Sequence, residues 1–355
     1  MIYRILFLFL VCFAFFAVNS SAQSGRKKPS PTPTPKTING PSVNNLPSQT
    51  ATPNPTPTPR PTAKDETDEI IKVDSVLVPI PVSVLDREGR AVTNLKLEDF
   101  ELKIDGKVVP ISDMTRSETP IRLAMLFDNS SSVLIAREFE KEAAVRFFRR
   151  VIRPEKDKAA LFSVATVTQL EQSLTSDVGS LTRMIDLFPP PEGATALLDG
   201  IVKVAEYLRS ANGRRVIVIV SDGDDTTSDG TLAETVKSLQ VNDCQVYVVK
   251  TTDFENFKRT GTRVGSANTR FLDAERRMSE IAAQTGGAVY SPIDEKEIKD
   301  AFDRISAELS QQYILSYYPE EAAEKSGEFR TISLAVKGKQ NLTIRARKGY
   351  YVDRK

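Results

Sequence analysis

The chain has 355 residues, of which 40% are hydrophobic and 27% are charged, as in ordinary globular proteins, and this length suggests two or three domains. The formal net charge is +1, so the basic bias typical of a nucleic-acid-binding protein is missing. There is no histidine, which excludes Ser-His-Asp and Cys-His nucleophile pairs and HExxH zinc sites. A metal site would therefore use oxygen ligands, which favours Mg²⁺, Mn²⁺ or Ca²⁺.

Residues 1–22 are predicted to be a signal peptide. Arg4 provides a basic start, Ile5 to Val18 form a short apolar segment, and Ser20-Ser21-Ala22 is a typical cleavage site. The apolar segment is too short for a comfortable membrane span, so we expect an exported chain without a stable span after cleavage. An uncleaved N-terminal anchor is the alternative. The final location would be the periplasm, the cell surface or the medium.

Residues 23–64 are predicted to be a disordered linker rich in proline and threonine. Eleven of the 21 prolines lie between Ser24 and Lys64, and almost no residue there is apolar. Such a segment cannot form a core and favours extended polyproline II structure. It could tether a domain to a membrane or wall, or serve only as a spacer.

Residues 68–117 are predicted to form an N-terminal β segment. Apolar residues alternate from Val76 to Val84, and Pro79 and Pro81 share one parity, which favours an edge strand or a bulge. Asp105-Gly106 lies between two short strands and predicts a hairpin. Two cysteines are present, but Cys12 lies in the leader, so the mature chain has no partner for Cys244.

Residues 118–310 change to alternating strands and helices. Apolar runs such as RLAMLF, KAALFSV, RRVIVIVS and CQVYVVK predict buried strands, and the shorter GAVYSP follows later. The segments between them predict helices over roughly Val133–Ile152, Val178–Leu187, Ala196–Ser210, Leu232–Gln240, Arg270–Gln284 and Lys296–Leu309. This order predicts a doubly wound α/β fold with a mainly parallel sheet. Strands return in residues 311–355, so we expect both β segments to form one small sandwich-like domain with the α/β domain inserted.

Three polar stretches fall where ligands bind in such sheets, at strand ends or helix starts. The first begins at Asp128 after RLAMLF, the second is Gly193-Ala194-Thr195, and the third is Ser221-Asp222-Gly223 after VIVIV. Their order and spacing resemble the metal ion-dependent adhesion site of von Willebrand factor type A (VWA) domains, and the resemblance covers about Ile121 to Leu309. It extends to a bacterial secreted subgroup with flanking β segments. The resemblance implies five metal ligands: Asp128, Ser130, Ser132, Thr195 and Asp222.

The chemistry agrees with this resemblance. Carboxylate and hydroxyl oxygens suit a hard cation such as Mg²⁺, which keeps several waters when it binds to proteins. A site with two carboxylates leaves the cation able to accept an acidic oxygen from outside. We therefore expect a secreted or envelope-tethered, non-enzymatic binding or adhesion module that engages a Glu or Asp of a protein partner through Mg²⁺, Mn²⁺ or Ca²⁺.

Other interpretations remain open from the sequence. Asp128, Ser130, Ser132 and Thr195 could be helix caps, and Asp224, Asp225 and Asp229 are expected to be a solvated acidic loop. VIVIVSDGDDT also fits a haloacid-dehalogenase-like phosphatase with Asp222 as nucleophile and Asp224 as acid and base, although the other two loops would then have no role. A third alternative is an envelope assembly protein whose β domain makes the contacts.

Overall fold

The computed structural model describes residues 77–116, 118–262, 269–319 and 326–352. The predicted signal peptide and proline-rich linker, residues 1–64, lie outside these ranges. Among the helices in the described ranges, none combines the length and apolar character that a membrane crossing requires.

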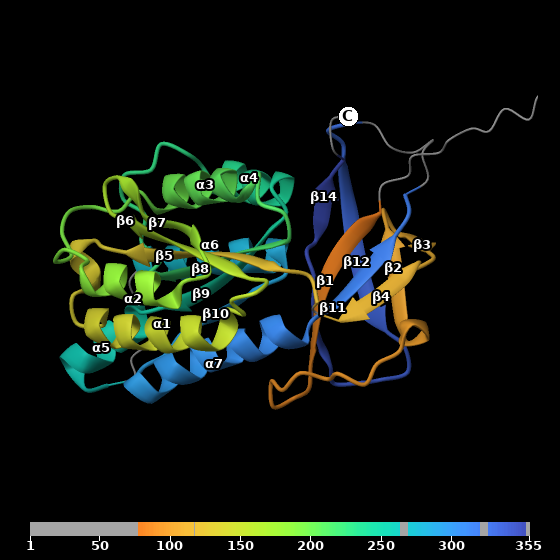
Figure 1. Cartoon of the computed structure of the whole chain (residues 1–355), viewed down its shortest axis with the longest axis horizontal. Coiled ribbons are helices and arrows are strands. Elements are labelled where there is room, and N and C mark those ends of the chain that lie inside the picture. The colour runs from red at the N-terminus through yellow and green to blue at the C-terminus, as the bar shows by residue number, and fades with distance from the viewer. Residues whose placement is uncertain (1–76, 117, 263–268, 320–325, 353–355) are drawn as a thin grey trace, which may run out of the picture. The chain divides into compact units, whose positions relative to one another are not determined.

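A six-stranded sheet forms the centre of the α/β domain (Figure 1). Its strand order is β10-β9-β8-β5-β6-β7, and all neighbours are parallel except β6 and β7. The strands are β5 (Ile121–Asp128), β6 (Lys158–Val164), β7 (Thr168–Thr175), β8 (Arg214–Ser221), β9 (Cys244–Lys250) and β10 (Ala288–Tyr290).

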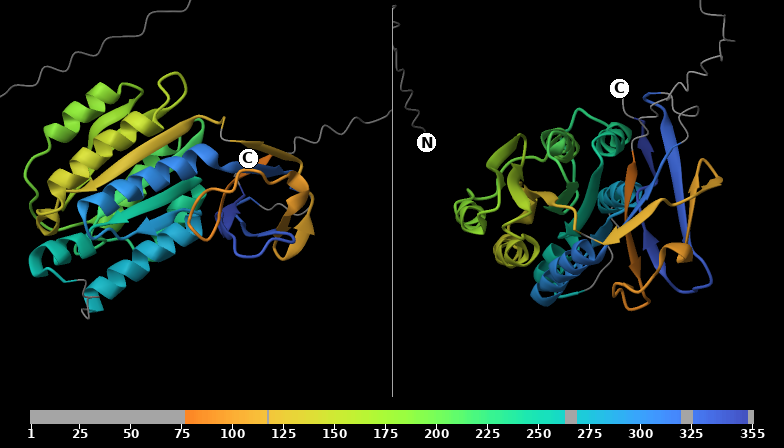
Figure 2. Two further views of the ribbon diagram at one scale, coloured as in Figure 1. Left: turned by 90° about the horizontal axis from the view of Figure 1, so that it is seen from below. Right: turned by 45° about the vertical axis from the view of Figure 1, so that its right-hand side comes forward.

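Helices cover both faces of this sheet (Figures 1 and 2). They are α1 (Arg137–Val151), α2 (Val178–Asp186), α3 (Leu197–Leu208), α4 (Leu232–Val241), α5 (Thr252–Thr260), α6 (Thr269–Thr285) and α7 (Glu295–Gln311). Alternate residues of β5 face opposite cores: Met125 packs with α1, α2 and α7, whereas Leu126 packs with α3, α4 and α6. The predicted doubly wound α/β class is therefore confirmed.

Two elements of this domain had no sequence prediction, and a third begins later than predicted. Strand β7 is polar and has only one buried residue, Thr168, because it lies at the antiparallel edge of the sheet, and α5 is short and charged. Instead of continuing from Val133, the first helix begins at Arg137, after a short 3₁₀ turn over Ser131–Val133. The carboxylate of Glu255 accepts hydrogen bonds from the amides of Ile135 and Ala136, the two residues directly before this start.

The chain before and after the α/β domain forms two four-stranded antiparallel sheets. One has the order β13-β1-β11-β4 and the other β14-β12-β2-β3, and a shared apolar core includes Ile80, Leu102 and Leu315. The strands are β1 (Val78–Leu85), β2 (Phe100–Ile104), β3 (Lys107–Val109), β4 (Asp113–Arg116), β11 (Tyr313–Tyr317), β12 (Phe329–Val336), β13 (Thr343–Arg345) and β14 (Gly349–Tyr351). A 3₁₀ turn, Leu97–Asp99, precedes β2.

Two local predictions in this region can be compared with the structure. Asp105 and Gly106 have φ values of 49° and 79° and join β2 to β3, as a type I′ hairpin requires. Strand β1 is internal to its sheet, so the edge-strand prediction is wrong for the strand as a whole. Its proline-containing half nevertheless pairs only with β11 among the described strands, because β13 pairs from Ser83 onward. Pro79 and Pro81 therefore lie where one side of the strand has no ladder partner.

Candidate metal site

The three predicted loops meet at the carboxyl edge of the six-stranded sheet. Strands β5 and β8 are parallel neighbours, with Phe127 opposite Val220, so Asp128 and Ser221 end side by side. Backbone hydrogen bonds join the loops: the Ser131 amide donates to the Gly193 carbonyl at 3.3 Å, and the Thr226 amide donates to the Thr195 carbonyl at 2.8 Å. The tertiary structure therefore brings together segments that lie about 65 and 30 residues apart in the chain.

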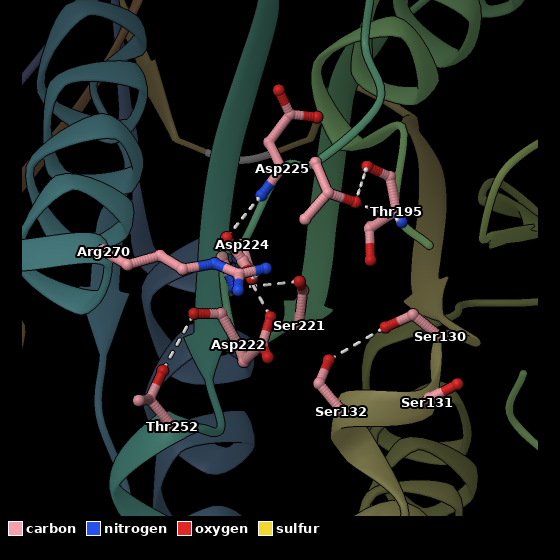
Figure 3. Close-up of polar contacts among 12 residues, drawn as sticks. Ser130, Ser131, Ser132, Thr195, Ser221, Asp222, Asp224, Asp225, Thr252 and Arg270 are labelled. Atoms are coloured by element: carbon pink, nitrogen blue, oxygen red, sulfur yellow. Dashed lines mark hydrogen bonds and ion pairs between the residues drawn. The ribbon is translucent and has the colours of Figure 1, made fainter. Parts of the chain in front are cut away.

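Side-chain oxygens from these loops lie close together (Figure 3). The hydroxyls of Ser130 and Ser132 are 3.0 Å apart, and Figure 3 shows them facing the same region as Asp222 and Thr195. The Ser221 hydroxyl donates to Asp128 Oδ2 at 2.5 Å. Within the described residues, all five predicted ligands thus lie in one cluster.

Burial makes the two carboxylates of this cluster unfavourable as a pair of anions. Asp128 is fully buried, and burial, followed by the nearby charge of Asp222, raises the pKa of Asp128 to about 6. Burial also raises the pKa of Asp222, whereas the Asp224 amide and the Ser132 hydroxyl act in the opposite direction. A bound divalent cation would offset this repulsion and the loss of hydration.

The serines of the first loop do not cap helix α1. The residue before this helix is Ala136, and the amides of Ile135 and Ala136 donate to Glu255 Oε1 at 2.9 and 2.7 Å. Ser130 precedes the 3₁₀ turn without a side-chain cap hydrogen bond. The capping alternative therefore does not account for these hydroxyls.

Thr195 does not cap helix α3 either. The amides of Leu197 and Leu198 donate to Asp225 Oδ1 at 2.8 and 3.3 Å, and Ser228 Oγ donates to the same oxygen at 2.6 Å. Asp225 thus accepts the hydrogen bonds of the first amides of this helix, and the Thr195 hydroxyl remains directed toward the cluster (Figure 3).

The acidic loop after β8 is only partly solvated. Asp225 caps α3, and Asp224 forms an ion pair with Arg270 at the start of α6, with only 14% of the Asp224 side chain exposed. Asp229 is exposed as expected. The expectation of a solvated loop was therefore wrong for Asp224 and Asp225, because their partners come from α3 and α6, which are distant in sequence.

Several supporting residues could not be recognised from the sequence. Arg137 donates to the Asp128 carbonyl at 2.9 Å and also bonds to the Asn129 side chain. Thr252 donates its hydroxyl proton to the Asp222 carbonyl at 2.8 Å. These bonds fix the backbone from which Asp128 and Asp222 project. The adjacency of Ser221 to Asp222 was the available sequence signal for a fourth nearby hydroxyl.

The donor set fits a hard cation. Two carboxylates and three hydroxyls are oxygen donors of the type that Mg²⁺, Mn²⁺ and Ca²⁺ prefer. In the part of the chain that the structure describes, no group of three or more His, Cys, Asp or Glu side chains is arranged to hold a metal. A zinc-type or all-carboxylate site therefore does not occur there, and the candidate site depends on its hydroxyls.

The chain is similar to several solved structures. An aerotolerance-related membrane protein from Bacteroides fragilis is 21% identical, covers 53% of this chain and 98% of its own, and has a TM-score of 0.42. For the PilB minor pilin from Streptococcus sanguinis these values are 12%, 58%, 64% and 0.41. For a von Willebrand factor type A protein from Catenulispora acidiphila they are 10%, 79%, 75% and 0.44.

No curated protein matches the chain in sequence. The sequence model of the von Willebrand factor type A domain family, by contrast, matches residues 123–304. This range contains the oxygen cluster at the carboxyl edge and the six-stranded sheet with its helices, except for the first two residues of β5 and the end of α7. The chain belongs to the von Willebrand factor type A domain family.

Proposed function

We propose that this protein is an exported binding module that engages an acidic side chain of a protein partner through a divalent cation. The observation that carries the proposal is the convergence of buried Asp128 and Asp222 with the hydroxyls of Ser130, Ser132 and Thr195. Membership of the VWA family supports it, although a fold by itself does not determine function.

The five residues would hold Mg²⁺, or Mn²⁺ or Ca²⁺ in its place. When bound, the cation would supply a positive centre that accepts an oxygen of a partner's Asp or Glu. Asp128 and Asp222 would contribute the two negative charges, and the hydroxyls would contribute neutral oxygens. Because the two protein charges neutralise a divalent cation without excess, a further carboxylate is accepted more readily than it would be at a site with three or four acids.

Export and tethering are part of the proposal and are supported by the sequence. The basic and apolar leader is typical of a signal peptide, and the proline-rich segment is typical of a linker that holds a domain away from a surface. The periplasm, the cell surface and the medium are all compatible with such a leader.

The metal proposal is tested by isothermal titration calorimetry of Mg²⁺ into chelator-treated protein. We expect saturable binding by the wild type and none by Asp128→Ala. Asp229→Ala is the matched control, because Asp229 is an exposed acid of the same loop as Asp222 but lies outside the cluster. No binding by the wild type, or equal binding by Asp128→Ala, would contradict the proposal.

Two further assays separate the alternatives. Turnover of p-nitrophenyl phosphate that is abolished by Asp222→Asn but kept by Ser130→Ala would favour the phosphatase interpretation. Capture of a partner from envelope extract that is equal with and without chelator would favour contacts made by the β domain. The proposed function requires neither outcome, since it expects no turnover and capture that depends on the metal.

A further inference from the structure

Exposed apolar side chains gather around the candidate metal site. Ten large apolar side chains are exposed among the residues that the structure describes, and five of them belong to segments at the carboxyl edge of the six-stranded sheet. They are Leu134 (60% exposed), Ile135 (45%), Val167 (63%), Leu187 (72%) and Leu272 (54%). Single exposed apolar residues are normal, but a concentration on one face is typical of an interaction surface.

Leu134 and Ile135 directly follow the serine loop. Leu134 comes two residues after Ser132, and the Ile135 amide is held by Glu255 at 2.9 Å. Their backbone is therefore fixed beside the oxygen cluster, while both side chains remain exposed.

Val167 lies beside the threonine loop. It belongs to the tight turn between β6 and β7, in which the Ala165 amide donates to the Val167 carbonyl at 3.4 Å. The Ala165 carbonyl accepts a hydrogen bond from Ala196, the neighbour of Thr195, at 2.8 Å. Val167 thus lies on the side of the cluster away from α6.

Leu187 and Leu272 are the other two exposed apolar residues at this edge of the sheet. The residue after Leu187 is Phe188, whose ring packs against Phe127 with centroids 5.7 Å apart, directly before Asp128. Leu272 comes two residues after Arg270, which pairs with Asp224. The five apolar residues therefore come from four different segments at the carboxyl edge of the sheet, where the oxygen cluster lies.

The centre of this surface is suited to an acid. Besides the proposed cation, Arg270 places a guanidinium beside Asp224, close enough to Asp222 to affect the pKa of both Arg270 and Asp222. A free inorganic anion or a sugar would occupy only the centre and leave the apolar side chains in water. A peptide with an acidic residue between apolar residues would bury both parts.

We propose that the surface formed by Leu134, Ile135, Val167, Leu187 and Leu272 binds a protein segment in which Asp or Glu is flanked by aliphatic or aromatic residues. This inference rests on the proposed function, because the acid is expected to bind the cation. It adds the chemistry of the partner. The acid of the partner segment positions that segment by binding the cation, and its apolar neighbours supply affinity and distinguish this segment from other acidic peptides.

The test is a selection from a phage-displayed random dodecapeptide library on immobilised full-length protein in Mg²⁺, with elution by EDTA. We expect the eluted peptides to share an Asp or Glu with a Leu, Ile, Val or Phe within two residues. A consensus with an acid but no apolar neighbour would overturn the inference and leave the proposed function standing. Recovery of no chelator-sensitive peptide, while calorimetry shows Mg²⁺ binding, would also overturn it.

A matched pair of variants then tests the surface with one synthetic consensus peptide. Val167→Ser is expected to weaken peptide binding about fivefold or more. Val108→Ser is the control, because Val108 is 64% exposed on β3 of the antiparallel sheets, and it should bind as the wild type does. Mg²⁺ affinity should be the same in all three proteins. Equal peptide binding by Val167→Ser and the wild type would refute the proposal that this surface binds the peptide. Absence of Mg²⁺ binding by the wild type would refute the proposed function itself.

Discussion

Glu140 is an acid that the fold buries completely, and this predicts a specific pH dependence of stability. The residue lies in α1 and is fully buried. Burial is the main reason that its pKa is raised from 4.5 to about 8. The charge of Arg137 lowers this pKa, and the charges of Asp128 and Glu255 raise it further.

The sign and size of the effect follow from proton linkage. Because the pKa is higher in the folded state, the folded protein binds more protons than the unfolded chain between about pH 4.5 and pH 8. The free energy of unfolding therefore falls as pH rises through this window, and the loss is complete above the folded pKa. At about 1.4 kcal/mol for each pKa unit, the full loss that Glu140 causes is about 5 kcal/mol.

The perturbation is Glu140→Gln, which removes the ionisable group but keeps the side-chain shape. We expect the wild type to lose several kcal/mol more than the variant between pH 5 and pH 9, because a buried amide has the same cost at every pH. The measurement is urea unfolding in EDTA, so that no cation near Asp128 affects Glu140. The comparison concerns the slope with pH and does not require the variant to be more stable at any single pH.

Glu142→Gln is the matched control for this experiment. Glu142 lies on the same helix, its side chain is 68% exposed, and it pairs with Arg146 in solvent. Its substitution should leave the pH dependence of the wild type unchanged. If the unfolding free energies of Glu140→Gln and the wild type ran parallel from pH 5 to pH 9, the argument from burial would be refuted.

Two further predictions concern the surroundings of the metal site. Arg270→Gln should bind Mg²⁺ about threefold to tenfold more tightly by calorimetry, because a positive charge beside Asp224 is removed. The control is Arg276→Gln, which removes an exposed charge from the same helix. Equal or weaker Mg²⁺ binding by Arg270→Gln than by the wild type would contradict this reasoning. Asp225→Ala should lower the free energy of urea unfolding by about 1–2 kcal/mol through loss of the α3 cap, whereas Asp229→Ala should not. An unchanged unfolding midpoint in Asp225→Ala would show that the cap contributes nothing.

Local patterns in the sequence determined the α/β class and the candidate site. The runs RLAMLF and VIVIV are buried on both faces in the structure, as their continuous apolar character predicted. Parallel strands end at a common edge, so polar residues directly after β5 and β8 had to lie near each other once both strands were in one sheet. Asp128 and Asp222 were therefore predictable from strand ends alone.

Elements with weak local patterns were not predictable. Strand β7 has a single buried residue, and α5 has few apolar residues, so neither has the periodicity of a buried element. The start of α1 was predicted four residues too early, and the amides directly before this start bond to Glu255, about 120 residues later in the chain. Partners at such separations leave no local signal.

What only the tertiary structure decided is which distant groups become neighbours. Pairing of β1 with β11 and β13, capping of α3 by Asp225, and the pairing of Arg270 with Asp224 all join segments far apart in sequence. The same is true of the apolar side chains around the cluster, each of which is unremarkable in its own segment. The sequence by itself determined which residues could bind a cation, because donor chemistry and strand ends are local properties. The burial of Glu140 and the composition of the surface around the site depend on packing, which is a property of the whole fold.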